Sequence, residues 1–207
     1  MPARTRSRWD LRRELREFYT ASPSAVKLVD VPALKFLRVD GTGGPDAPEF
    51  ALAIQMLFNL AYTIRFTLKA EQGLEYPVLP LEAQWVLPTG NDPPDPDARS
   101  KMGWTLLLMV PDVVTARILA EGVERVRRKG RPVTGCRLWR FREGRSAQTL
   151  HVGPYSGEAA SMARLLSFLE GNGWVPRGKH HEIYIGDPRR SRPERLRTIL
   201  RTPVRPA

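Results

Sequence analysis

The feature that most constrains the fold is an order of secondary-structure elements that occurs twice in the 207-residue chain. Alternation of apolar and polar residues predicts strands, and apolar residues at helical spacing predict helices. By these criteria the order strand–helix–strand–strand occupies residues 33–110 and again residues 147–204. The two copies share few letters, but a repeated order of elements is typical of an internal duplication. We therefore expect two tandem modules of an α+β protein.

The first copy is predicted to consist of a strand at 33–39, a helix at 49–69 and strands at 78–87 and 104–110. The helix is apolar almost all round, so it should be buried on more than one side. The last strand is almost entirely apolar, which favours a central place covered on both faces. The proline-rich stretch 88–103 is predicted to be a loop.

The second copy is preceded by residues that favour a turn, Glu143 and Gly144. We expect strands 137–141 and 147–152 to pair around this turn. The remaining elements are a helix at 157–170, a strand at 180–185 and a strand at 195–204, the last after a short helical turn begun at Pro193.

The length suffices for one large domain or for two small ones, and a chain of this size buries roughly 70% of the surface of its unfolded state, so a core can form. We expect one domain. We expect an N-terminal arm at 1–30, which contains a short amphipathic helix at 8–19. The parts that follow are a first module at 31–110, a connector helix within 111–136 and a second module at 137–207.

The formal net charge of +11 is distributed unevenly. Residues 1–16, 125–145 and 187–207 together carry +17, so the rest of the chain carries −6. Only six of the 33 basic residues are Lys, which points to a compositional preference for Arg. No nucleic-acid-binding motif is present, so a nucleic-acid partner is not expected.

The segregated charge gives a first testable expectation. The basic segments should face solvent, and any DNA binding should be weak and should disappear at roughly 0.2 M salt, as non-specific binding through counterion release does. A salt titration in a DNA-binding assay measures this. Sequence-selective binding that persists at that salt would contradict it.

The single cysteine, Cys136, excludes an internal disulfide framework. The N-terminus is basic but has no apolar run behind it, so we expect no secretory signal. The longest uncharged apolar stretch is Phe50–Ile64, 15 residues, which is below the roughly 18 that span a bilayer. We therefore expect a cytoplasmic protein without a membrane partner, while the oligomeric state stays open.

Glu182 is the strongest candidate for chemistry. In the predicted strand HHEIYIG it shares one face with Tyr184, and Ile183 and Ile185 share the other. If the face is wet, Glu182 is an ordinary solvated residue of an edge strand. If the face lines a cavity, the carboxylate either pairs with a cationic ligand or has its pKa raised by burial.

Glu82 occupies the corresponding place in the first copy. In LEAQW the alternation places Glu82 with Gln84 on one face, and Ala83 with Trp85 on the other. Alternatively, Glu82 lies on a solvated face of the sheet and has no role in a site.

Several aromatic residues lie in or beside predicted core elements, where most aromatics only pack. Tyr155 stands out because the segment HVGPY places it on a turn that enters a helix. The candidates for ligand contact are Trp85, Trp104, Phe58, Tyr62 and Tyr155.

Metal and cofactor chemistry are not expected. The adjacent His180 and His181 point to opposite strand faces, and His151 is distant in sequence. The chain has no Gly-rich phosphate loop, HExxH or CxxC motif, and no nucleophile elbow for Ser–His–Asp catalysis.

The sequence resembles the GyrI-like superfamily of gyrase-inhibitory-type and AraC-type effector-binding domains. The segments that carry the resemblance are SPSAV, VPALKFLRVDG, EFALAIQMLFNLAYTI, YPVLPLEAQW, AQTLHVGPYSGE and HHEIYIGDPRRSRPERLRTILRTPV, which span nearly all residues from about 8 to 204. The resemblance implies two strand–helix–strand–strand modules with antiparallel sheets, related by a pseudo-twofold axis, and a ligand cleft between them.

The resemblance also implies a function. Related domains bind bulky planar drugs, often cationic, with aromatic rings around a buried glutamate, and Glu182 matches that glutamate. A subset that this chain resembles in its PLExxW and HHEIYL-type segments is implicated in hydrolysis of the cyclopropane of DNA-alkylating cyclopropanoid antibiotics. The chain departs from the family at Val86, where a second aromatic often follows Trp85.

Three functions follow as hypotheses. The first is a hydrolase of planar electrophiles that detoxifies cyclopropanoid-type compounds. Glu182 would be its general base, Tyr184 or Tyr155 would orient the water, and Trp85 and Trp104 would stack on the ligand. Glu82 would stabilise positive charge or position the water. The second is a multidrug-binding module without turnover, and the third a protein that binds gyrase or another macromolecule.

Overall fold

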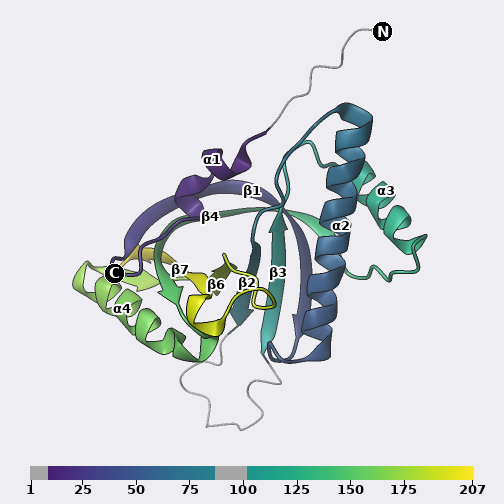
Figure 1. Ribbon diagram of the computed structural model, residues 1–207. Helices are drawn as coiled ribbons and strands as arrows, with labels where there is room; N and C mark the ends of the chain where they lie inside the picture. The colour runs from purple at the N-terminus through teal and green to yellow at the C-terminus, as the bar shows by residue number, and fades with distance from the viewer. Residues whose placement is uncertain (1–8, 87–101) are drawn as a thin grey trace.

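The computed structural model describes residues 9–86 and 102–207 and shows a mixed helix and sheet fold (Figure 1). Seven strands pair in the order β4-β1-β3-β2-β6-β7-β5, every pairing is antiparallel, and β4 also pairs with β7. The extra pairing partly closes the sheet into a barrel. The predicted α+β class with antiparallel sheets is confirmed. The strands are β1 (Lys27–Thr42), β2 (Leu81–Val86), β3 (Gly103–Met109), β4 (Arg137–Val152), β5 (Trp174–Pro176), β6 (His180–Tyr184) and β7 (Arg197–Pro206).

Helices flank the barrel on two sides: α2 and α3 lie on one side and α4 on the other (Figure 1). Short helices precede β1, α4 and β7, and the one before β7 confirms the helical turn predicted at Pro193. The helices are α1 (Leu11–Glu14), η1 (Arg16–Phe18), α2 (Pro48–Gln72), α3 (Ala116–Arg127), η2 (Tyr155–Gly157), α4 (Glu158–Gly171) and η3 (Pro193–Arg195).

The pairing order is the same in both halves of the chain. In the first half β1 pairs with β3 and β3 with β2, and in the second β4 pairs with β7 and β7 with β6. The contacts β1–β4 and β2–β6 join the halves. A pseudo-twofold relation of the Cα traces stays a prediction, which a superposition of the two modules tests.

The hairpin predicted around Glu143 and Gly144 is wrong, because β4 runs through these residues as one strand. Gly144 has a φ of 70°, which an L side chain rarely adopts. This glycine bends the strand instead of reversing it. Residues up to Gln148 pair with β1, and residues from Ser146 onward pair with β7.

Other boundaries differ by smaller amounts. The helix predicted at 8–19 is two short helices, β1 begins at Lys27, before the predicted 33, and the short β5 was not predicted. The predicted loop at 88–103 lies largely outside the described residues.

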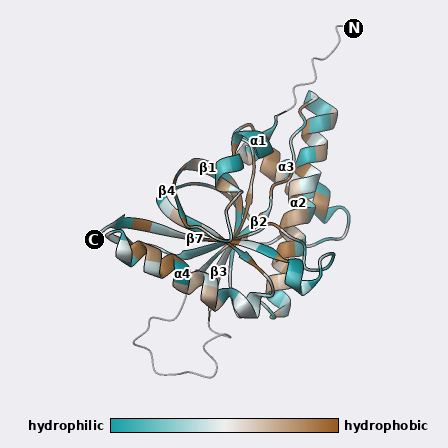
Figure 2. Cartoon of the chain, turned by 60° about the vertical axis from the view of Figure 1, so that its left-hand side comes forward, coloured by the Kyte–Doolittle hydropathy of each residue, from teal (hydrophilic) through white to brown (hydrophobic). Residues whose placement is uncertain are grey.

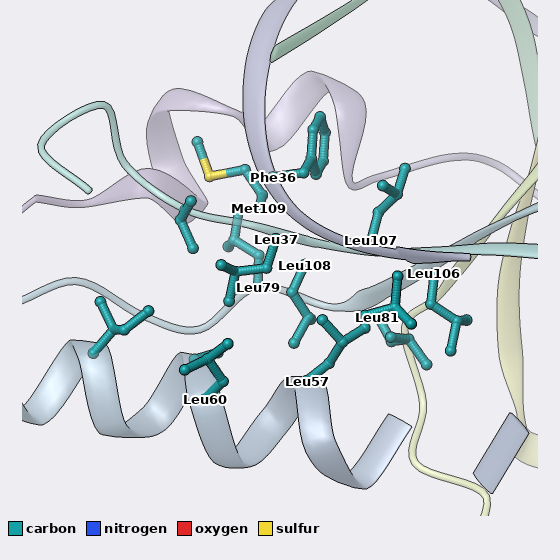
Figure 3. Packing of buried hydrophobic residues seen from close by; sticks show 14 of the residues in the cluster. Phe36, Leu37, Leu57, Leu60, Leu79, Leu81, Leu106, Leu107, Leu108 and Met109 are labelled. Atoms are coloured by element: carbon teal, nitrogen blue, oxygen red, sulfur yellow. The ribbon is translucent and has the colours of Figure 1, made fainter. Parts of the chain in front are cut away.

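The largest hydrophobic cluster lies between α2 and the sheet. Leu57 and Leu60 point from α2 toward Leu79 and Leu108 (Figure 3), and burial of each such side chain contributes about 1.5–3 kcal/mol. A second cluster packs α4 against β4 and β7 through Leu165. Figure 2 shows hydrophobic residues along both of these helices.

Helix α2 is long and apolar enough to cross a bilayer by length and composition alone. Core helices of other proteins pass the same test, and seven side chains of α2 are buried. This is weak evidence for a membrane span.

Candidate functional site

Strand β6 lies between β2 and β7, so Glu182 does not belong to an edge strand. Directly opposite residues share a sheet face. Glu182 lies opposite Ala83, and His180 lies opposite Trp85. The alternation therefore places Glu182 and Tyr184 on one face, as the sequence predicts, and the pairing of β2 with β6 places Trp85 on the same face.

The carboxylate of Glu182 is held by its neighbours on that face. The hydroxyl of Tyr184 donates a hydrogen bond of 2.7 Å to Glu182 Oε2. His180 Nε2 lies 3.5 Å from Glu182 Oε1, and 14% of the Glu182 side chain is exposed. Burial and the charge of Glu182 raise the pKa of Tyr184 well above its ordinary value, so its hydroxyl stays a donor.

Tyr155 and Glu158 approach the same face from the turn that begins α4. The ring of Tyr155 meets that of Tyr184 edge-on, with 5.9 Å between the centroids. Burial raises the pKa of Tyr155, and the charges of Glu158 and Glu182 raise it further. The structure thus brings together all three residues predicted to be catalytic, Glu182, Tyr184 and Tyr155, although their catalytic role stays a prediction.

Glu158, which the sequence analysis did not single out, is the second carboxyl group of this face. Burial raises its pKa to about 8, the charge of Glu182 adds to the rise, and the nearby hydroxyl of Thr198 opposes it. Glu158 is therefore mostly protonated at pH 7. It is the first residue of α4, three positions after Tyr155, and this spacing within HVGPYSGE was the available signal.

Unpartnered polar atoms gather around the two carboxyl groups. Within the described chain, the buried atoms that lack a well-formed hydrogen bond include Trp85 Nε1, His180 Nδ1, Thr198 Oγ1 and Glu158 Oε1. Buried polar groups are normally paired, and exceptions often mark functional sites. We define the carboxyl site as Glu158, Glu182, Tyr155, Tyr184 and Trp85.

The two predicted stacking tryptophans are both buried, each with 4% exposure. Trp85 stacks on Phe50 at 5.3 Å, and Trp104 meets the same ring edge-on at 5.4 Å. Trp104 also covers Gly41, where an added Cβ would lie 2.2 Å from the indole. Trp85 is part of the carboxyl site, whereas Trp104 packs against Phe50 and Gly41.

This close approach gives a stability prediction. Gly41→Ala should lower the free energy of unfolding by about 1–3 kcal/mol, because overpacking forces the indole of Trp104 out of place. Urea denaturation measures the change. Gly171→Ala is the control, since nothing lies within 4 Å of its new Cβ. Equal stability of the two variants would contradict the packing argument.

Phe58 and Tyr62 lie on α2 and stack on each other, with 6.3 Å between the centroids. Tyr62 also stacks on Phe66, and 44% of Tyr62 and 55% of Phe66 are exposed. These rings form an exposed aromatic row along the helix. No contact joins them to Glu182, so their part in ligand binding stays a prediction.

Glu82 lies on the opposite sheet face from Glu182, in the interior of the barrel. It is 1% exposed, accepts a hydrogen bond of 2.5 Å from Tyr19, and lies 3.0 Å from His181 Nε2. The solvated face considered for Glu82 is thus wrong. Its predicted contact with the ligand stays untested, and the sheet separates it from the carboxyl site.

Glu82 belongs to a buried charged network that the sequence analysis missed. His181 Nδ1 donates to Glu143 Oε1 at 2.9 Å, and Arg201 Nη1 donates to Glu143 Oε2 at 3.1 Å. Arg201 also donates to Gln148. All of these side chains are nearly inaccessible to solvent. We call Glu82, Glu143, His181, Arg201 and Gln148 the interior network.

Two cavities lie away from the carboxyl site. One of about 400 Å³ lies on α3 and is lined by residues such as Glu121 and Arg125. The other, of about 190 Å³, lies beneath Trp9. Among the residues that the structure describes, no group of three or more His, Cys, Asp or Glu side chains is arranged to hold a metal ion.

Comparisons with known proteins find relatives in sequence and in fold. Residues 137–205 match the model of the GyrI-like small-molecule-binding domain. A crystal structure of a conserved protein from Listeria innocua shares 36% identity with a TM-score of 0.86, over 95% of this chain and 99% of that one. A hydrolase from Listeria innocua shares 34% identity with a TM-score of 0.83, over 95% and 99% of the two chains.

The EcmrR C-terminal domain shares the fold alone, with 13% identity and a TM-score of 0.55 over 88% of this chain and 98% of that one. No curated protein matches the chain significantly. The family match covers β4 to β7, including Tyr155, Glu158 and Glu182, and relatives more than 30% identical cover the whole fold. The chain is therefore a member of the GyrI-like small-molecule-binding family.

Proposed function

We propose that the protein is a hydrolase of planar electrophilic small molecules of the cyclopropanoid type, with the carboxyl site as its active site. The observation that carries the proposal is the pair of carboxyl groups that meet at one sheet face in different surroundings. Glu182 accepts a hydrogen bond of 2.7 Å from the hydroxyl of Tyr184. Glu158 has a pKa of about 8 and holds a proton at pH 7. One group can take a proton while the other gives one.

The pair suits the opening of a cyclopropane conjugated to a carbonyl. Glu182 takes a proton from water as the water oxygen bonds to a ring carbon. The carbon–carbon bond of the ring breaks, and its electron pair moves toward the carbonyl oxygen. Glu158 donates its proton to that oxygen. The sum is the addition of one water to the substrate, and a second proton exchange with solvent resets the two carboxyl groups.

Aromatic residues of the site would hold the planar part of such a substrate. Trp85, which is 4% exposed, lies beside Tyr184, and Tyr155, which is 41% exposed, lies at the surface. Burial of roughly 200 Å² of ligand against these rings contributes about 5 kcal/mol, before the cost of association. The Listeria innocua hydrolase at 34% identity supports a hydrolytic function.

Mass spectrometry of a cyclopropanoid incubated with the protein tests the proposal directly. We expect conversion of the compound to a product heavier by one water, with turnover beyond one equivalent of protein. Binding of the compound without conversion would favour a module that sequesters drugs. If the compound is neither bound nor converted, the proposal is wrong.

A further inference from the structure

The turn that carries Tyr155 and Glu158 packs against the buried imidazole of His151. His151 lies near the end of β4 and is 5% exposed. Its Nε2 lies 3.0 Å from the carbonyl oxygen of Pro154, and its Nδ1 lies 3.1 Å from Ser161 Oγ. A carbonyl oxygen can only accept, so Nε2 carries a proton and donates it to Pro154, while Ser161 Oγ is the hydrogen-bond partner of Nδ1.

The backbone of this turn is shaped around the ring. Gly153 has a φ of 134°, a conformation that L side chains rarely adopt. A Cβ added to Gly153 or to Gly157 would lie 3.5 Å from the imidazole, so both ends of the turn contact it. The Pro154 carbonyl also accepts from the N–H of Gly157 at 2.9 Å. His151 and Gly157 thus hold the same oxygen.

We propose that His151 is a positioning residue, whose bond from Nε2 to the Pro154 carbonyl sets the place of Tyr155 and Glu158 against Glu182. Pro154 directly precedes Tyr155, and the turn that it begins ends at Glu158, so a displacement of this carbonyl moves both side chains. The bond between Ser161 and Nδ1 fixes the ring from α4, the helix that Glu158 begins. The part of the proposal that concerns catalysis rests on the proposed function.

Substitution of His151 by Gln or by Asn distinguishes the contributions of the two hydrogen bonds that the imidazole makes. The amide of Gln reaches the position of Nε2, and that of Asn reaches the position of Nδ1. His151→Gln should keep the bond to Pro154, whereas His151→Asn should keep only the bond to Ser161. Ser161→Ala removes the second bond alone, disturbs the core least, and serves if a His151 variant fails to fold.

Carboxyl ¹³C NMR titration of Glu158, assigned with Glu158→Gln, is the primary measurement and needs no substrate. In His151→Asn the pKa of Glu158 should fall from about 8 toward its ordinary value of 4.5, because the carboxyl group moves into water. In His151→Gln it should stay closer to that of the natural protein. At pH 7, kcat for a cyclopropanoid should fall about tenfold or more in His151→Asn and within about threefold in His151→Gln.

The outcomes distinguish the two proposals. An unchanged Glu158 pKa in His151→Asn overturns the positioning role, even if Glu182→Gln abolishes hydrolysis. A fallen pKa supports it, even if the protein has no hydrolytic activity. Equal losses of kcat in both His151 variants, in step with equal losses of unfolding free energy, would reduce His151 to a structural residue. In Ser161→Ala the pKa of Glu158 should fall as well, but by less. An unchanged pKa of Glu158 in Ser161→Ala, or in His151→Asn, would overturn the proposal.

Discussion

Glu182→Gln should lower the rate of hydrolysis by about two orders of magnitude or more, the usual contribution of a general base. The substitution keeps the size of the side chain and still offers an oxygen to the hydroxyl of Tyr184. It removes only the group that accepts the proton of water. Steady-state kinetics on a cyclopropanoid measure the effect. The pKa of Glu158 should also fall, because the charge of Glu182 helps to raise it.

Glu182→Gln should lower the affinity for ligands less than it lowers the rate of turnover. The affinity for an uncharged planar ligand should stay within about tenfold, since stacking and burial supply most of it. The affinity for a cationic ligand should drop further, because its charge would lose a partner in a poorly solvated place. Isothermal titration with a matched pair of ligands separates the two cases.

Glu82→Gln is the matched control, since Glu82 lies across the sheet from Glu182. Its effect on hydrolysis should be milder, although it also disturbs the interior network. Full hydrolysis by Glu182→Gln, with Glu82→Gln inactive, would reverse the two roles. Full hydrolytic activity of both variants would contradict a mechanism that depends on these carboxylates.

Local patterns were sufficient for much of the fold and for the core of the site. The two-residue period of HHEIYIG placed Glu182 beside Tyr184, and the same period in LEAQW placed Trp85 away from Glu82. Both inferences depend on one strand at a time. The doubled strand–helix–strand–strand order likewise needed only the periodicity of each segment, and the pairing order of the halves agrees with it.

What could not be predicted depends on contacts between distant segments. Glu143 followed by Gly144 has the composition of a turn, yet the glycine bends β4 between two partners, and Glu143 meets His181 and Arg201 inside the barrel. Nothing local marks a glutamate that is 2% exposed in a basic stretch. The spacing within HVGPYSGE marks the place of Glu158, but its raised pKa depends on burial and on the charge of Glu182 from β6, which no local pattern shows.

The interior network should dominate the stability of the barrel. Arg201 is 2% exposed, and its guanidinium bonds Glu143, Gln148 and the backbone carbonyl of Phe18. Arg201→Met should therefore lower the free energy of unfolding by about 3–5 kcal/mol, because removal of one partner leaves buried charge uncompensated. Arg205→Met, on the same strand but exposed, is the matched control and should change stability by less than about 0.5 kcal/mol.

The same network predicts how stability varies with pH. Burial alone would lower the pKa of His181, but Glu143 and Glu82 raise it to about 9. Its contribution is therefore complete below the ordinary value of 6.5 and is lost as the pH rises through about 9. Burial would raise the pKa of Glu143, but His181 and Arg201 lower it to about 2. Its contribution is complete above 4.5 and is lost as the pH falls through about 2.

These two groups place the highest stability between about pH 4.5 and 6.5. Glu158 adds a separate decline between about pH 4.5 and 8, because burial raises its pKa to about 8. Urea denaturation at a series of pH values should show the free energy of unfolding falling on the alkaline side, between about pH 6.5 and 9. The comparison is made in a Glu158→Gln background, which removes the decline due to that carboxyl group. There His181→Gln should be less stable at pH 6 and should flatten the remaining alkaline decline, since the titrating imidazolium is gone. His180→Gln, on the other sheet face, should keep the decline. If His181→Gln retains the alkaline slope, or if Arg201→Met is as stable as Arg205→Met, the network does not hold the barrel through paired charge.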